Sequence, residues 1–404
     1  MALTVLASIF QRWLVGLVAL LLIVQLGACG GGSGGDDTGP TLPPPITNLP
    51  GAGELKDVSL LKTLSVSEIE AAMTSGEDEA LVTRPRYAVK AYRMTYLTQD
   101  GAGSEVLASA LMVVPQKAAG ALSPVFSYQH PTLKRDADAP SHLNELNGPE
   151  IALASLGFIV LSADYVGYGV SRGVPHPYIL ATPSAAAVID MLTAARYWRQ
   201  TQQIADNGQL LMAGYSEGGF VTMAAARAMQ SGQSVHRDHL VLIAPGAGPY
   251  NAVTTLDELL DQVRDEYPLI GWLLHPGLLQ YLSDSDRDNI RDALLKSLLG
   301  SDVDVVFMPT LLDAYLADDR ALLASVSHVD DWLPGIPVRM FHGRDDRTVS
   351  FFNSSNTLQK MWDKGAGSRV SVTQCTVVPA DHIPCVPQYW QFLIDTLGPV
   401  TKDL

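Results

Sequence analysis

The 404-residue chain is 47% hydrophobic and 17% charged, against roughly 25% charged in an average protein, so it can build a large core and is not disordered over most of its length. Length alone does not separate one domain with an insertion from two domains, because α/β domains often reach about 250 residues. The 27 basic and 42 acidic residues give a net charge of −15, which repels phosphate backbones, argues against nucleic acid as a partner and favours a neutral substrate.

The first 28 residues have the features of a secretion signal. Arg12 precedes an apolar run from Trp13 to Leu26, which is too short to span a bilayer comfortably. The four residues that end at Cys29, Leu-Gly-Ala-Cys, resemble the lipobox of bacterial lipoproteins, in which the cysteine becomes the lipid-modified N-terminus after cleavage. Ordinary signal cleavage, with Cys29 as a bystander, is the alternative.

A segment rich in glycine and proline, residues 29–55, follows and is expected to be the tether of a lipid-anchored domain. In Gram-negative lipoproteins an aspartate directly after the cysteine favours retention in the inner membrane, but Gly30 occupies that position here. The resemblance therefore implies an outer-membrane lipoprotein of a Gram-negative bacterium, held at the membrane by its N-terminal lipid. A periplasmic or secreted protein is the alternative.

From about Leu60 the chain alternates between β-branched runs and helical stretches. The first two runs flank the turn at 100–103 and predict an antiparallel hairpin. The expected strands cover residues 87–98, 107–114, 125–129, 157–163, 209–213, 240–244, 338–341 and 370–377. The expected helices cover residues 149–156, 182–200, 218–229 and 389–397. A mostly parallel eight-stranded sheet flanked by helices is typical of an α/β-hydrolase fold.

One interval does not fit this alternation. Residues 249–332 have a helical pattern rich in leucine and aspartate, without a convincing strand. We therefore expect a helical cap inserted between two parts of the hydrolase core, residues 56–248 and 333–404. The apolar cluster at 269–274 fits either the wall of an acyl pocket or simple packing on the core.

The strongest motif is Gly-Tyr-Ser-Glu-Gly-Gly at 214–219, placed directly after an expected strand and directly before an expected helix. This is the context that a nucleophile elbow requires, since side chains larger than glycine would clash in its tight turn. The five-residue pattern alone occurs often by chance, so the prediction rests on the strand-turn-helix context. It makes Ser216 the catalytic nucleophile and the backbone N–H of Glu217 one oxyanion donor.

An activated serine needs a base and a carboxylate, which should follow the elbow in the order acid, then histidine. The expected strand at 338–341 runs into His-Gly-Arg-Asp-Asp-Arg-Thr-Val, which resembles the hydrolase pattern His-Gly-x-x-Asp-x-x-Val and selects Asp346 over Asp345. His382 is the only histidine after Asp346, and it lies in the loop after the last expected strand. We therefore expect His382 to be the general base.

The second oxyanion donor is expected after the strand that ends at Gln129. Many hydrolases have His-Gly-x at this place and use the amide of the third residue. Here the sequence is His130-Pro131-Thr132, and the proline leaves the amide of Thr132 able to donate. A role for His130 as a metal ligand lacks a second ligand at metal spacing, and the chemistry requires no metal or organic cofactor.

Cys375 and Cys385 are the only thiols besides Cys29. An oxidising compartment makes a disulfide between them the default, and this bridge would close a small loop around His382. Two free buried thiols are the alternative.

Four segments resemble the secretory lipase family of bacteria and fungi. They are Tyr128-Gln129-His130, residues 163–169, His176-Pro177-Tyr178 and the helix around Asp190. The resemblance implies hydrolysis of a small-molecule or lipid carboxylic ester by Ser216, His382 and Asp346 through an acyl-enzyme. It departs from the family at Pro131, a position often held by glycine. A serine peptidase of the same fold and a lipid-anchored binding protein without turnover are the alternatives.

Overall fold

The computed structural model describes residues 47–75, 84–232, 234–266, 275–300 and 302–404, which belong to one compact unit. The predicted signal peptide at 1–28, Cys29 and most of the predicted tether lie outside the described residues. No helix within the described residues is both long and apolar enough to cross a membrane.

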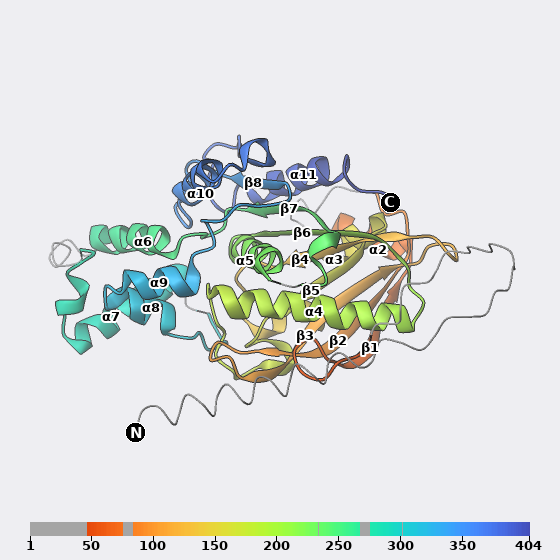
Figure 1. The fold of residues 1–404 in the computed structure, drawn as a ribbon, viewed down its shortest axis with the longest axis horizontal. Coiled ribbons are helices and arrows are strands. Elements are labelled where there is room, and N and C mark those ends of the chain that lie inside the picture. The colour runs from red at the N-terminus through yellow and green to blue at the C-terminus, as the bar shows by residue number, and fades with distance from the viewer. Residues whose placement is uncertain (1–46, 76–83, 233, 267–274, 301) are drawn as a thin grey trace, which may run out of the picture. The chain divides into compact units, whose positions relative to one another are not determined.

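A nine-stranded sheet forms the centre of this unit (Figure 1). Across the sheet the strands are, in order, β1 (Leu55–Leu64), β2 (Val89–Gln99), β3 (Glu105–Pro115), β5 (Ile159–Ala163), β4 (Ser123–Gln129), β6 (Asp206–Tyr215), β7 (Leu240–Gly246), β8 (Val338–His342) and β9 (Val370–Gln374). The pairings from β1 to β5 are antiparallel, and those from β5 to β9 are parallel. With helices on both faces, this sheet confirms the predicted α/β-hydrolase fold.

The sheet has one strand more than the eight predicted. The additional strand is β1, which lies at the sheet edge and, among the described strands, pairs only with β2. Leu64 is its only buried residue, whereas Leu60 and Leu61 are 55% and 39% exposed. Such a strand lacks the alternation of buried and exposed side chains by which strands are recognised in a sequence.

Each face of the sheet carries its own apolar core. The side chain of Met212 in β6 belongs to one core, and those of its neighbours Leu211 and Ala213 belong to the other, because successive residues of a strand point to opposite faces. The first core includes side chains of α4 (Ala181–Thr201), α5 (Glu217–Ser231) and α10 (Phe352–Asp363). The second includes side chains of α2 (Val66–Ser75), α3 (Pro149–Leu156) and α11 (Val386–Leu397). The sequence pattern does not reveal α2 and α10.

In the described part of the interval between β7 and β8 there are four α-helices, and Figure 1 shows them grouped together at the left. They are α6 (Ala252–Glu266), α7 (Asp284–Leu299), α8 (Thr310–Leu316) and α9 (Arg320–Ser327). Their buried side chains, among them Leu256, Leu294 and Tyr315, join the same apolar core as α4 and α5. These helices occupy the interval for which we predict a cap.

Candidate active site

Ser216 lies in the tight turn between β6 and α5. Its backbone has φ 58° and ψ −123°, a conformation that is strained for a residue with a side chain. A Cβ atom at Gly218 would lie 2.0 Å from the backbone oxygen of Gln129, and one at Gly214 would lie 2.4 Å from the same oxygen. Both positions therefore require glycine, because the end of β4 passes directly against the turn.

The structure brings the three predicted catalytic side chains together. Nε2 of His382 is 2.9 Å from Oγ of Ser216, and Nδ1 of His382 is 2.6 Å from Oδ2 of Asp346. The three residues come from the turn after β6, the loop after β8 and the loop after β9. Both contacts are within hydrogen-bonding distance, so a proton can pass from the serine to the imidazole.

Asp346 is a buried carboxylate surrounded by donors. Its Oδ1 accepts hydrogen bonds from the N–H groups of Thr348 and Val349, at 2.9 and 2.8 Å. Its Oδ2 lies 3.2 Å from Nε2 of His342, in addition to its contact with His382. Burial raises the pKa of Asp346, but the hydrogen bonds with His342 and His382 outweigh this effect and hold it at about 2. The group is therefore ionised at neutral pH, and His342 contacts the carboxylate rather than Ser216.

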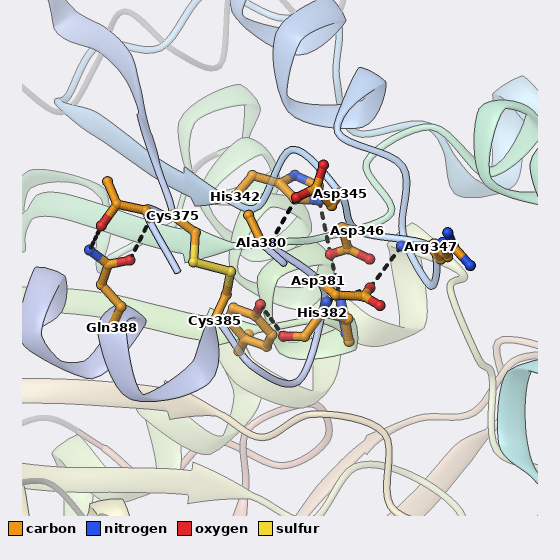
Figure 2. The surroundings of a disulfide bond; sticks show 12 residues. His342, Asp345, Asp346, Arg347, Cys375, Ala380, Asp381, His382, Cys385 and Gln388 are labelled. Carbon is orange, nitrogen blue, oxygen red and sulfur yellow. Dashed lines mark hydrogen bonds and ion pairs between the residues drawn. A yellow bond between two sulfur atoms is a disulfide. The ribbon is translucent and has the colours of Figure 1, made fainter. Parts of the chain in front are cut away.

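The loop that carries His382 is closed by the predicted disulfide. Cys375 follows β9, Cys385 immediately precedes α11, and the two are joined as Figure 2 shows. The hydroxyl of Tyr215, the residue before Ser216, donates a hydrogen bond of 2.7 Å to the backbone oxygen of His382. The loop is therefore attached at both of its ends and also at the histidine itself.

Backbone contacts also join this loop to the one that carries Asp346 (Figure 2). The carboxylate of Asp345 accepts a bond from the N–H of Ala380, and the N–H of Asp345 donates to the oxygen of Ala380. The carboxylate of Asp381 accepts a bond of 3.0 Å from the N–H of Arg347. Asp345, the alternative acid, thus faces the backbone of Ala380.

An apolar cavity of about 340 Å³ opens onto Ser216 and His382. On the core side it is lined by Tyr128, Pro131, Thr132, Tyr178, Ile383 and Trp390, among others. Leu256 of α6, Leu299 of α7 and Leu311 of α8 line it from the other side. Among the described lining residues, Lys134 is the only lysine, arginine, aspartate or glutamate. The cluster at 269–274, considered above for an acyl pocket, lies outside the described residues.

The two predicted oxyanion donors lie close to the elbow. Glu217 is the first residue of α5, where backbone N–H groups have no acceptor within the helix. Thr132 lines the cavity together with Ser216, and its Oγ1 is 3.2 Å from the hydroxyl of Tyr178. The structure does not assign the two amides a role, which stays a prediction.

His130 is buried against aromatic side chains. Its ring stacks on that of Tyr165 at 4.0 Å, and Nδ1 and Nε2 contact the backbone oxygens of Pro131 and Asp164. Burial lowers the pKa of this imidazole. In the described part of the chain, no group of three or more histidine, cysteine, aspartate or glutamate side chains is arranged to hold a metal ion.

The sequence analysis did not identify a buried contact between His176 and the side chain of Glu217. Nε2 of His176 lies 2.8 Å from Oε1 of Glu217. His176 stood out only as part of a segment that resembles a lipase family, and nothing in its spacing indicates its partner.

Comparison with known proteins gives one family match. The model of the alpha/beta hydrolase family matches residues 118–395. No curated protein sequence matches the chain. The rice cell wall degrading esterase LipA from Xanthomonas oryzae is similar in structure, with a TM-score of 0.69 and 22% identity over 87% of this chain and 100% of that one. Lipase A from Candida antarctica has a TM-score of 0.52 and 17% identity over 84% of this chain and 82% of that one. At these identities, the similarity shows a common fold.

Proposed function

The chain belongs to the alpha/beta hydrolase family, and we propose that it is a serine hydrolase of carboxylic esters. The observation that carries this proposal is the continuous path of hydrogen bonds from Ser216 through His382 to Asp346, at the wall of an apolar cavity. A nucleophile, a base and an orienting carboxylate in this order can activate a serine for acyl transfer.

In the proposed mechanism, Oγ of Ser216 attacks the ester carbonyl carbon while Nε2 of His382 takes its proton. The ionised Asp346 stabilises the imidazolium, and the N–H groups of Glu217 and Thr132 donate to the oxyanion. The C–O bond to the alcohol then breaks, and His382 protonates the departing oxygen. Water attacks the acyl-enzyme in the same way and releases the acid.

The cavity favours an uncharged ester. Most of its described lining residues are aliphatic or aromatic, and Lys134 is the only lysine, arginine, aspartate or glutamate among them. A charged acyl group would therefore lose its hydration there with little compensation. The structural similarity to an esterase and a lipase agrees with an ester substrate. We also propose that the protein is exported and held at the outer membrane by a lipid on Cys29, as the N-terminal sequence indicates.

The test is the initial rate of the purified protein lacking residues 1–28 on p-nitrophenyl esters from acetyl to palmitoyl, beside its S216A variant. We expect turnover that S216A abolishes while the variant keeps its circular dichroism spectrum. Highest rates on long chains would identify a lipase, and highest rates on short chains an esterase. Turnover that persists in S216A would refute the assignment.

The same preparation separates the proposed activity from the two alternatives. A matched p-nitroanilide presents the same acyl group on an amide, so serine-dependent cleavage of the anilide in preference to the ester would indicate a peptidase. Absence of serine-dependent turnover on every ester and amide would favour a binding protein.

A further inference from the structure

A buried pair of a carboxyl group and an imidazole lies behind the nucleophile elbow. Nε2 of His176 is 2.8 Å from Oε1 of Glu217, and the side chains of the two residues are only 2% and 1% exposed. Glu217 directly follows Ser216, and its backbone N–H is one of the two proposed oxyanion donors. The mechanism above gives the side chains of this pair no role.

The hydrogen-bond geometry fixes how many hydrogens the pair carries. Nδ1 of His176 lies 2.8 Å from the backbone oxygen of Val166, which can only accept, so Nδ1 carries a hydrogen. The contact with Glu217 needs a second hydrogen, either on Nε2 or on the carboxyl group. The pair is therefore an imidazolium with a carboxylate, or a neutral imidazole with a carboxylic acid. In both cases its net charge is zero.

The net charge of the pair is important because His176 and Glu217 are buried among aromatic side chains. The ring of His176 contacts those of Tyr168 and Phe307, with centroids 5.1 and 5.4 Å apart, and Oε2 of Glu217 is buried without a hydrogen-bond partner in the described part of the chain. Charges in such a setting interact strongly, because little water screens them. A carboxylate of Glu217 without its counter-charge would repel the negative charge that develops on the substrate oxygen.

His176 is also packed toward the second proposed oxyanion donor. Its ring lies parallel to that of Tyr165, with centroids 6.1 Å apart, and Tyr165 stacks on His130. The hydroxyl of Tyr165 donates to the backbone oxygen of His130, two residues before Thr132. The side chain of His176 therefore pairs with Glu217, which carries one proposed donor, and packs toward the loop of Thr132, which carries the other.

We propose that His176 is a positioning residue that balances the charge of Glu217, so that the pair stays neutral, and thereby preserves an oxyanion site able to accept negative charge. This inference rests on the proposed function. It leads to an unusual expectation: removing His176 alone should be worse for turnover than removing both His176 and the charge of Glu217.

The test compares H176Q, E217Q and the double variant in the full-length protein, purified in detergent and assayed on p-nitrophenyl butyrate. We expect H176Q to lower kcat at least about tenfold with a smaller change in KM, since the loss concerns the transition state. Adding E217Q to H176Q should raise kcat again by several fold. As a matched control, H236Q replaces another buried histidine, whose Nε2 contacts Thr193, and should leave kcat unchanged.

A second readout separates the electrostatic role from simple packing. A trifluoromethyl ketone bonds to the serine as an anionic hemiketal, so its inhibition constant should rise in H176Q and fall again in the double variant. If H176Q does not fold, H176N, which keeps a donor toward Val166, is compared with H176N/E217Q in the same way. Equal or lower kcat in the double variant, with no recovery of inhibitor affinity, would overturn the proposal. Wild-type protein without turnover dependent on Ser216 would instead refute the proposed function itself.

Discussion

At the scale of single residues, two neighbouring aspartates have different partners. Asp346 accepts hydrogen bonds from His382 and from backbone amides, and its pKa of about 2 keeps it ionised. Asp345 accepts a bond from the N–H of Ala380. An ionised Asp346 fixes a hydrogen on Nδ1 of His382, which leaves Nε2 to take the proton of Ser216. The two aspartates are therefore a matched pair for testing that orientation.

Replacing Asp346 by asparagine should lower kcat by about 10³ to 10⁴-fold, because the amide neither fixes the required tautomer nor stabilises the imidazolium. D345N keeps an acceptor for the N–H of Ala380 and should lose far less activity. The measurement is kcat on one p-nitrophenyl ester for both variants, with thermal unfolding as the control for folding. Similar losses in the two variants would contradict the selection of Asp346.

The sequence was sufficient to predict that Ser216, Asp346 and His382 lie together, as they do in the structure, because a local motif and the order along the chain reduce the candidates for each position. It was not sufficient for the contact between His176 and Glu217. These residues are brought together only by the packing of the segment after β5 against α5, and no motif spacing records that packing. The hydrogen bond that the N–H of Ala380 donates to the carboxylate of Asp345 was missed because no motif spacing records it either.

At the scale of elements, the loop between β9 and α11, which carries His382, is held in place by several independent attachments. The disulfide between Cys375 and Cys385 closes it. Hydrogen bonds of the Ala380 backbone and of the Asp381 carboxylate join it to the loop after β8. Loss of any single attachment should therefore affect stability more than catalysis.

We expect the C375A/C385A variant to lose about 3 kcal/mol of unfolding free energy, the loop-closure entropy of a bridge that spans a short segment. Its kcat should fall by less than about tenfold, because the remaining contacts still position His382. Urea unfolding and kcat are measured for the variant and for the wild-type protein, and the wild type is measured both with and without reductant. A loss of activity as large as that of S216A would show that the bridge itself is needed to position the base.

A second junction between elements is sensitive to pH. Asp190 of α4 accepts a hydrogen bond from Thr98 of β2, and its burial raises its pKa to about 6, although the bond from Thr98 lowers it. The folded state thus holds this proton more tightly than the unfolded chain. The resulting stabilisation is complete below the unfolded pKa, near 4, and is lost as pH rises through about 6.

As pH rises from 4 to 8, the unfolding free energy of D190N should therefore increase relative to that of the wild type, by up to about 3 kcal/mol. The amide keeps an oxygen to accept from Thr98 but has no charge to bury. Denaturant unfolding of both proteins at the two pH values measures the change. A difference between the proteins that is the same at pH 4 and pH 8 would show that Asp190 does not titrate in this range.

The elements that the sequence predicted well are those that bury one or both faces, such as α3 and β6. Strand β1 escaped prediction because only Leu64 among its residues is buried, so the strand is specified by pairing with β2 rather than by its own pattern. Hydrogen bonds across a sheet edge leave no periodic signal in a sequence.

At the scale of the whole molecule, the proposed site depends on distant parts of one chain. The match to the family extends over residues 118–395 and includes all three residues of the proposed triad. The cavity lies between side chains of the sheet's loops and those of α6, α7 and α8, so its shape depends on helices inserted between β7 and β8. The N-terminal segment bears on a separate property, the location of the protein in the cell.

The lipobox-like sequence predicts that Cys29 carries the lipid that holds the protein at a membrane. In a Gram-negative host, the wild-type protein should incorporate labelled palmitate and float with outer-membrane vesicles, whereas C29A should do neither. G30D provides a matched control, because it keeps the cysteine but places an aspartate after it, and should move the labelled protein to the inner membrane. Esterase activity per molecule should be equal in all three, since the compact unit that contains the proposed site extends from Ile46 to Leu404 and does not include Cys29 or Gly30. Unlabelled wild-type protein in the soluble fraction would instead favour ordinary signal cleavage and release, and labelled C29A would refute Cys29 as the lipid-modified residue.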